Sequence, residues 1–191
     1  MIQERLKELR AQMQERGIDI YIVPTSDFHQ SEYVGEYFKA RKYMTGFTGS
    51  AGTAVITKEE AGLWTDGRYF IQAEKQLEGS TVKLFKMGEE GVPKVEEYVK
   101  DHLTEGSCIG FDGRVMDAKS GEKYAKMAEE KKAALYVKED LVGNIWKDRP
   151  QLPANKVWIL EDAYAGRSMA DKIADVRTQM QKEGADIHIL S

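Results

Sequence analysis

Three side-chain types that nucleophilic hydrolases combine lie close together near the amino terminus of the sequence. Asp27, His29 and Ser31 supply an acid, an imidazole and a hydroxyl within a few residues of one another. A catalytic triad needs these groups to point at one another in a relay of hydrogen bonds, and residues two apart on a loop seldom do so. We therefore favour a structural role, in which Ser31 or Asp27 caps a helical turn over residues 33–38 and His29 bonds nearby backbone.

Arg68 is a second candidate, and the chemistry that it suggests is anion recognition. Asp66 is a good helix N-cap, and Phe70, Ala73 and Leu77 follow at the spacing of a helix with one buried stripe. This pattern places Arg68 in a first helical turn, where the helix dipole disfavours a cation by about 0.3–1 kcal/mol. A nearby anion should compensate. It is either Asp66 in a surface ion pair or a bound carboxylate that the guanidinium fork recognises.

A glycine-rich loop and a hairpin must position these side chains. Gly46, Gly49 and Gly52 recur every three residues, which predicts a shaped loop whose backbone turns tightly or approaches another group. Two β-rich runs follow, at Thr53–Thr57 and residues 61–64. The connection between them is short enough for a hairpin.

The remainder of the first 150 residues alternates between helical and strand patterns. The predicted helices are residues 2–16, 67–77, 93–103 and 120–132, and the predicted strands are residues 18–23, 81–87, 108–111 and 135–137, before a last segment at residues 141–146. This order predicts an α/β domain in which helices flank a β-sheet. The hairpin makes the sheet mixed instead of purely parallel.

The clearest boundary lies at residues 149–153, where two prolines resist both helix and central strand. Beyond it, residues 169–190 repeat the opening helix and strand at an offset of 167 residues, which indicates a duplicated domain. The predicted division is a domain over residues 1–148, a linker over residues 149–166 and the first helix and strand of a truncated second domain over residues 167–191. We expect the chain to be a piece of a longer protein.

Composition and charge exclude several classes of protein. The chain has 28 basic and 32 acidic residues without a basic block, so we expect no nucleic-acid or membrane partner. No signal peptide and no run of about 20 apolar residues is present, which suggests a cytoplasmic protein. Cys108 cannot form an internal disulfide, and His29, His102 and His188 lack the spacing of a metal site.

Four stretches of the chain resemble the amino-terminal part of a cytosolic-type Xaa-Pro aminopeptidase (aminopeptidase P). They are DFHQSEY at residues 27–33, GFTGSAGTAVIT at residues 46–57, LWTDGRYFIQA at residues 63–73 and IWKDRP at residues 145–150. The resemblance implies a creatinase/prolidase-type amino-terminal fold, with two such domains ahead of a catalytic domain beyond residue 191. It implies a parent enzyme that releases the first residue from peptides with proline second, while this fragment alone is inactive.

The resemblance also implies cofactors, partners and site residues. The parent would hold two divalent metals, often manganese, in its catalytic domain and would form a homodimer, whereas this fragment would bind no metal. Arg68 would lie near the bound peptide with Asp66 holding its fork, and His29 and Arg41 would be weaker candidates for the same rim. The alternative is a non-catalytic protein-binding module of the same fold. A hydrolase built on Asp27, His29 and Ser31 is a third hypothesis, and it would lose its activity in Ser31→Ala.

Overall fold

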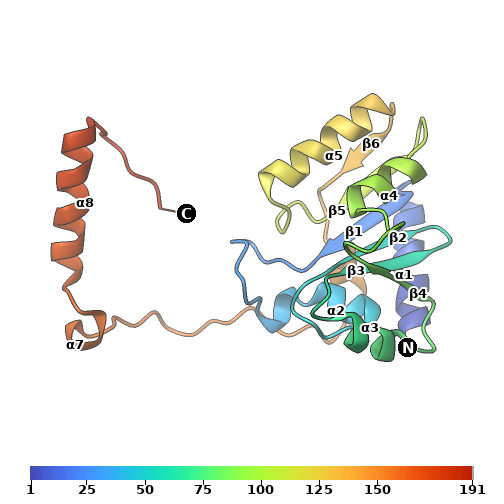
Figure 1. The fold of residues 1–191 in the computed structure, drawn as a ribbon, viewed down its shortest axis with the longest axis horizontal. Helices are drawn as coiled ribbons and strands as arrows, with labels where there is room; N and C mark the ends of the chain where they lie inside the picture. Colours follow the sequence, from blue (N-terminus) through green and yellow to red (C-terminus); the bar gives the residue numbers. More distant parts are fainter. Residues whose placement is uncertain (191) are drawn as a thin grey trace. The chain divides into compact units, whose positions relative to one another are not determined.

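A computed structural model describes residues 1–190 of the 191-residue chain. The chain divides into two compact units, Met1–Leu152 and Pro153–Ser191 (Figure 1). The strands of the first unit are β1 (Ile20–Pro24), β2 (Thr53–Thr57), β3 (Ala61–Thr65), β4 (Val82–Lys86), β5 (Cys108–Phe111) and β6 (Ala134–Tyr136). Its helices are α1 (Ile2–Glu15), a 3-10 turn at Glu36–Phe38, α2 (Ala40–Thr45), α3 (Phe70–Leu77), α4 (Val95–His102), α5 (Ala118–Glu130) and α6 (Leu141–Ile145).

The six strands form one mixed sheet in the order β4-β3-β2-β1-β5-β6. The predicted hairpin is confirmed, because β2 pairs antiparallel with β3, and β2 also runs antiparallel to β1. All other neighbours pair in parallel. The carboxyl ends of β1, β3, β4, β5 and β6 therefore share one edge of the sheet with the start of β2. We call this edge the carboxyl edge.

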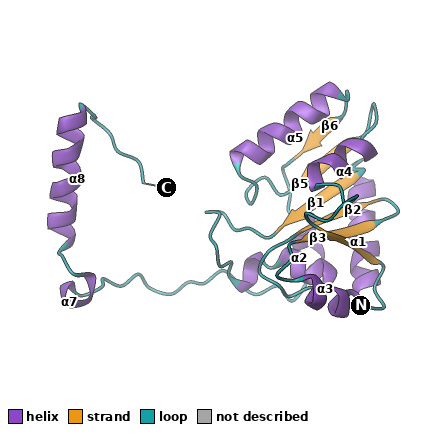
Figure 2. Cartoon of the chain, in the orientation of Figure 1, coloured by secondary structure: helices purple, strands orange, loops and turns teal. Residues whose placement is uncertain are grey.

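Helices cover both faces of the sheet (Figure 2). Alternation along the strands divides the core, since Tyr21 and Val23 of β1 face one cluster while Ile20 and Ile22 face the other. Helices α1, α2, α3 and α6 contribute to the first cluster, and α4 and α5 contribute to the second. The predicted fold class, a mixed sheet flanked by helices, is confirmed.

Gly62 of β3 shows how tightly the second cluster is packed. The Trp64 ring stacks on the Phe85 ring at 4.0 Å between centroids and 3° between planes. A Cβ atom on Gly62 would lie 2.6 Å from Trp64 and 2.7 Å from Phe85. The ring pair therefore requires glycine at this position.

The ends of the first unit lie close together. Helix α1 packs on α6, and Met1 and Asp148 line the same surface hollow. The side chain of Tyr21 also ties β1 to the end of the unit, since its hydroxyl accepts from the Leu141 backbone N–H at 3.0 Å. Burial raises the pKa of Tyr21 above its ordinary value, so this hydroxyl stays protonated.

Two local predictions near the carboxyl edge are wrong. The helix expected from Gly67 begins at Phe70 with Tyr69 as its N-cap, so Arg68 precedes the helix. The turn expected over residues 33–38 is only the 3-10 turn at its end, and neither Ser31 nor Asp27 caps it. Short-range hydrogen bonds to the Asp66 and Asp27 carboxylates replace the predicted helical turns.

The second unit contains α7 (Asp162–Ala165) and α8 (Met169–Glu183). The predicted helix is confirmed as α8, with the Ser168 hydroxyl accepting from the Asp171 N–H at its start and Gly184 at φ 65° after its end. The predicted strand over residues 186–190 is not formed, because the described residues of the second unit include no partner strand with which to pair. Within residues 1–190, no helix has the length and apolar character needed to cross a membrane.

Candidate functional site

The carboxyl edge brings together the four residues predicted for a substrate rim, His29, Arg41, Asp66 and Arg68. His29 lies on the loop after β1, the glycine-rich loop precedes β2, and Asp66 and Arg68 follow β3 (Figure 1). In open α/β sheets, ligands bind outside the carboxyl ends of the strands. We therefore take this edge as the candidate site.

Asp66 and Arg68 form a tight ion pair within one turn. Asp66 Oδ1 accepts from the Arg68 backbone N–H at 3.1 Å and from Arg68 Nε at 2.8 Å, and Asp66 Oδ2 accepts from Arg68 Nη2 at 2.8 Å. These bonds lower the pKa of the Asp66 carboxyl and raise the pKa of Arg68. Because Arg68 precedes α3 and already has a counter-ion, the helix-dipole argument for a missing anion is wrong.

The guanidinium of Arg68 nevertheless faces solvent with donors to spare. Its side chain is 68% exposed, and its bonds to Asp66 use only part of the five N–H groups that an arginine carries. Its Cζ lies 5.2 Å from the centre of the Tyr69 ring. The Tyr69 hydroxyl lies 2.6 Å from Ser50 Oγ in a hydrogen bond that lowers the pKa of Tyr69. Arg68 is thus held in place and remains able to bind an acceptor.

Arg41, expected at a rim, instead lies inside the carboxyl edge and is only 4% exposed. Its Nε donates to Thr25 Oγ1 at 2.9 Å, its Nη1 donates to the Phe47 carbonyl at 2.7 Å, and its Nη2 donates to the Gly49 carbonyl. Burial lowers the pKa of Arg41 to about 10. Arg41 therefore closes the predicted glycine-rich loop, whose turn at Gly46 needs its φ of 77°.

His29 lies on the exposed loop that follows β1. The Asp27 carboxylate accepts from the backbone N–H groups of His29 and Ser31, at 2.9 Å each, and does not bond the imidazole. The bond from Ser31 contributes most to a lowered pKa of Asp27. The triad of Asp27, His29 and Ser31 is therefore not assembled among the described contacts.

A second aspartate-glycine-arginine turn, which the sequence analysis missed, follows β5. Asp112 Oδ1 accepts from the Arg114 backbone N–H and from Arg114 Nε at 3.0 Å each, and Asp112 Oδ2 accepts from Nη2 at 2.9 Å. Arg114 also lies 3.7 Å from Asp140 and has its Cζ 5.3 Å from the Phe28 ring centre. The signal was present, because the tripeptide Asp-Gly-Arg occurs twice, each time directly after a strand.

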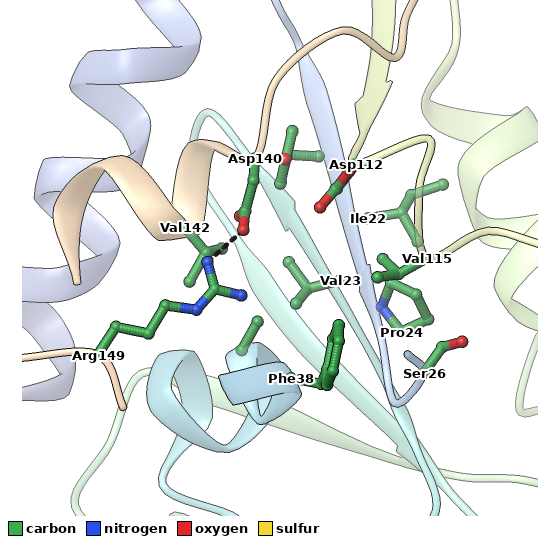
Figure 3. A pocket seen from close by; sticks show the side chains of 12 residues that line it. Ile22, Val23, Pro24, Ser26, Phe38, Asp112, Val115, Asp140, Val142 and Arg149 are labelled. Atoms are coloured by element: carbon green, nitrogen blue, oxygen red, sulfur yellow. Dashed lines mark hydrogen bonds and ion pairs between the residues drawn. The ribbon is translucent and has the colours of Figure 1, made fainter. Parts of the chain in front are cut away.

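Asp140 and Asp112 line a small cavity beside β1 (Figure 3). Figure 3 shows the Arg149 guanidinium pointing at Asp140, with which it forms an ion pair, and the Phe38 ring nearby. Arg149 Nε also donates to the Tyr37 carbonyl at 2.8 Å. The cavity measures about 20 Å³, which suits a single water molecule. This cluster closes the domain and leaves no room for a peptide.

The described residues offer no metal centre. Within residues 1–190, no group of three or more His, Cys, Asp or Glu side chains is arranged to hold a metal ion. The exposed guanidinium of Arg68 is the group at the carboxyl edge whose chemistry suits an anion or a carbonyl.

The family profile described as Creatinase/Prolidase N-terminal domain matches residues 5–139. A second profile with the same description matches residues 148–191. The first match alone covers most of the chain. The resemblance noted in the sequence is therefore confirmed.

Curated relatives extend well beyond this chain. It is 41% identical over 196 aligned residues to Aminopeptidase P2 of Arabidopsis thaliana, which covers 100% of the chain and 28% of that protein. It is 46% identical over 184 residues to a probable Xaa-Pro aminopeptidase P of Pyrenophora teres f. teres, which covers 94% of the chain and 27% of that protein. The chain thus spans just over a quarter of the length of these relatives.

Solved structures agree with the family profiles. The crystal structure of X-prolyl aminopeptidase from Caenorhabditis elegans, described as a cytosolic enzyme with a di-nuclear active site, matches with a TM-score of 0.87 and 32% identity over 97% of this chain and 32% of that one. The N-terminal domain of cytoplasmic peptidase PepQ from Mycobacterium tuberculosis matches with a TM-score of 0.53 and 26% identity over 74% of this chain and 98% of that one. The chain belongs to the creatinase/prolidase N-terminal domain family.

Proposed function

We propose that the chain is the non-catalytic amino-terminal part of a metal-dependent Xaa-Pro aminopeptidase. The parent would release the first residue from peptides whose second residue is proline. Its catalytic domain, which lies outside this chain, would hold two divalent metal ions, and we propose that both are manganese. The names of the two curated relatives and of the Caenorhabditis elegans structure support this proposal. We place the parent in the cytoplasm as a homodimer.

The observation that carries a role in the substrate site is the make-up of the carboxyl edge. Most of the exposed large apolar side chains of the first unit follow the carboxyl ends of its strands, namely Phe28, Tyr33, Ile71, Met87 and Val137. These side chains lie along one edge of the sheet, from Met87 after β4 to Val137 after β6, where a second protein surface would cover them. An edge that combines them with the exposed Arg68 fits the rim of a peptide site formed with another domain.

Within this rim, we assign Arg68 to the peptide and Asp66 to holding its guanidinium. A bidentate carboxylate partner fixes the plane of the fork and leaves its outer N–H groups for a backbone carbonyl of the substrate. His29, on the neighbouring loop, is a weaker candidate for contact. Arg41 would act on the rim indirectly, because its bonds hold the glycine-rich loop.

We also propose that the chain holds one whole domain and the start of another, with boundaries at residues 1–148, 149–166 and 167–191. The second family match, over residues 148–191, supports the presence of a second domain. So does the apolar stripe of α8, on which Met169 is 68%, Ile173 43% and Val176 40% exposed. A helix with an uncovered apolar stripe is typical of an element that packs on a sheet.

The proposal is tested by assaying this chain and the full-length protein on an Xaa-Pro peptide with added manganese. We expect turnover by the full-length protein, loss of that turnover with a chelator, and none with the 191-residue chain. Turnover by the short chain would contradict the assignment of catalysis to the missing domain. The exposed apolar edge would also serve a non-catalytic protein-binding module, and an inactive full-length protein would favour that function.

A further inference from the structure

A second cavity lies at the carboxyl edge, between the loop after β1 and the glycine-rich loop. It measures about 140 Å³, and three cations contribute to its lining: Lys39, Arg41 and Lys42. Ser50 also lines it. Because Ser50 Oγ bonds the Tyr69 hydroxyl next to Arg68, the cavity adjoins the rim assigned above to the peptide.

Arg41 is buried in this cavity wall without a counter-ion. No carboxylate lies within 4.0 Å of its guanidinium in the described part of the chain. Its three hydrogen bonds go to a hydroxyl and two carbonyls, all of them neutral. Buried charges in proteins are normally paired, since desolvation of an unpaired charge is costly. An anion bound in the cavity would supply the missing negative charge.

The two lysines share one carboxylate between them. Lys39 forms an ion pair with Glu36, and Lys42 Nζ lies 4.0 Å from the other oxygen of the same carboxylate. Glu32, on the loop after β1, is the only acid among the lining residues. The three cations therefore have two carboxylates near them, Glu32 in the lining and Glu36 beside it. Of the two lysines, Lys42 is the one whose ammonium group is less committed to other groups.

We infer that this cavity, lined by Lys39, Arg41, Lys42 and Ser50, binds a carboxylate of the peptide substrate downstream of proline. We call it the carboxylate pocket. The inference rests on the proposed function, because the peptide must reach the rim at Arg68 for its downstream end to enter the pocket. A carboxylate suits the site, since the lysine ammonium groups donate to its oxygens and its charge offsets that of Arg41.

The first test compares a short Xaa-Pro peptide as the free acid and as its carboxy-terminal amide in the full-length enzyme. We expect the acid to have the lower KM, because a contact far from the scissile bond is made equally in the ground state and the transition state. Lys42→Gln should reduce the preference for the acid by about 10-fold, the scale of one charge-assisted hydrogen bond. The double variant Lys39→Gln/Lys42→Gln should remove it.

Lys58→Gln is the matched control. Lys58 is an exposed lysine in the hairpin turn between β2 and β3, at the opposite edge of the sheet. It forms an ion pair with Asp19, which precedes β1. This variant should keep the full preference for the acid. Equal handling of acid and amide by the wild-type enzyme, or an unchanged preference in both lysine variants, would overturn the inference. A glutamate in an amidated peptide that restores the low KM would identify a side-chain carboxylate as the occupant.

Two measurements separate failure of the pocket from failure of the proposed function. Arg68→Ala should weaken the acid and the amide equally, because it changes the rim and leaves the pocket intact. If the full-length protein has no Xaa-Pro activity, the 191-residue chain can be titrated with both peptides while the amide resonances of Gly49 and Ser50 are followed by NMR. Shifts with the acid alone support the pocket, and the absence of shifts overturns it.

Discussion

Two arginines at the carboxyl edge, Arg68 and Arg114, are held by the same kind of Asp-Gly-Arg turn but differ in how many carboxylates surround them. Arg68 and Arg114 each bond the aspartate two residues earlier through their backbone N–H, Nε and Nη2. The side chain of Asp66 is 35% exposed, whereas that of Asp112 is 11% exposed and Arg114 also approaches Asp140. Arg114, although 55% exposed, lies near two carboxylates, whereas Arg68 is 68% exposed with one, so Arg68 has more donors free for a ligand.

Replacement of Arg68 tests this difference in the full-length enzyme. Arg68→Ala should lower kcat/KM for Xaa-Pro peptides roughly 10- to 100-fold, about 1.4–3 kcal/mol, which is the scale of one charge-assisted contact. The melting temperature should barely change, because the lost pair is exposed. Lys83→Ala removes a similarly exposed ion pair elsewhere and should leave kcat/KM unchanged. If Arg68→Ala keeps its activity, Arg68 is only a surface charge.

Asp27 gives the fold a predictable dependence on pH. Backbone bonds lower its folded pKa, so its stabilisation is present above the ordinary carboxyl value of about 3.9 and is lost as pH falls through the lowered value. Asp27→Asn should therefore destabilise the chain by roughly 1–2 kcal/mol at pH 7 and by less at pH 3. Urea midpoints at both pH values measure this. Asp101→Asn, at an exposed carboxylate, is the control. If the loss of stability in Asp27→Asn were as large at pH 3 as at pH 7, the role given to the Asp27 carboxylate would be refuted.

At the scale of elements, the sequence patterns predicted those helices and strands that are determined by residues close together in the chain. The hairpin of β2 and β3 and the apolar stripe of α1 follow from local periodicity, so their positions were expected. The start of α3 was not, because the Asp66 side chain is used by Arg68 instead of the helix. The burial of Arg41 depends on carbonyls of the glycine-rich loop, which no spacing of residue types encodes.

Two glycines in regular elements should respond oppositely to the same substitution. Gly62→Ala should destabilise the fold by about 1–3 kcal/mol, because its methyl group would clash with the stacked rings of Trp64 and Phe85. Gly121→Ala in α5 meets no atom within 4 Å and should stabilise the helix by about 0.5–1 kcal/mol. Thermal or urea unfolding of both variants checks this pair. A neutral Gly62→Ala would mean that the ring stack moves without cost.

At the scale of the whole chain, the first unit has a hydrophobic core, whereas none of the described residues of the second unit is buried. The buried hydrophobic residues all lie at or before Ile145, while the apolar residues of α8 and of residues 186–190 are largely exposed. A duplicated helix was predictable from the repeat in the sequence. The missing strand was not, because strand formation depends on a partner that this stretch of chain does not include.

Limited proteolysis should divide the chain between its units. Residues 153–160 have no regular structure and are exposed, so we expect cleavage between residues 150 and 166 and a resistant product that begins at the amino terminus. Mass spectrometry of the products locates the cut. Protection that grows with protein concentration would show instead that α8 docks on another chain.

The contact between α1 and α6 brings the two ends of the first unit together, so the unit is suited to circular permutation. Because Met1 and Asp148 line one hollow, a short linker could join them while the backbone is opened in the exposed hairpin turn at Lys58 and Glu59. Such a circular permutant should keep the sheet order and both cores, and its circular dichroism spectrum should match that of residues 1–150. The same closeness lets the unit be inserted as a cassette into a surface loop of a host protein without stretching either junction.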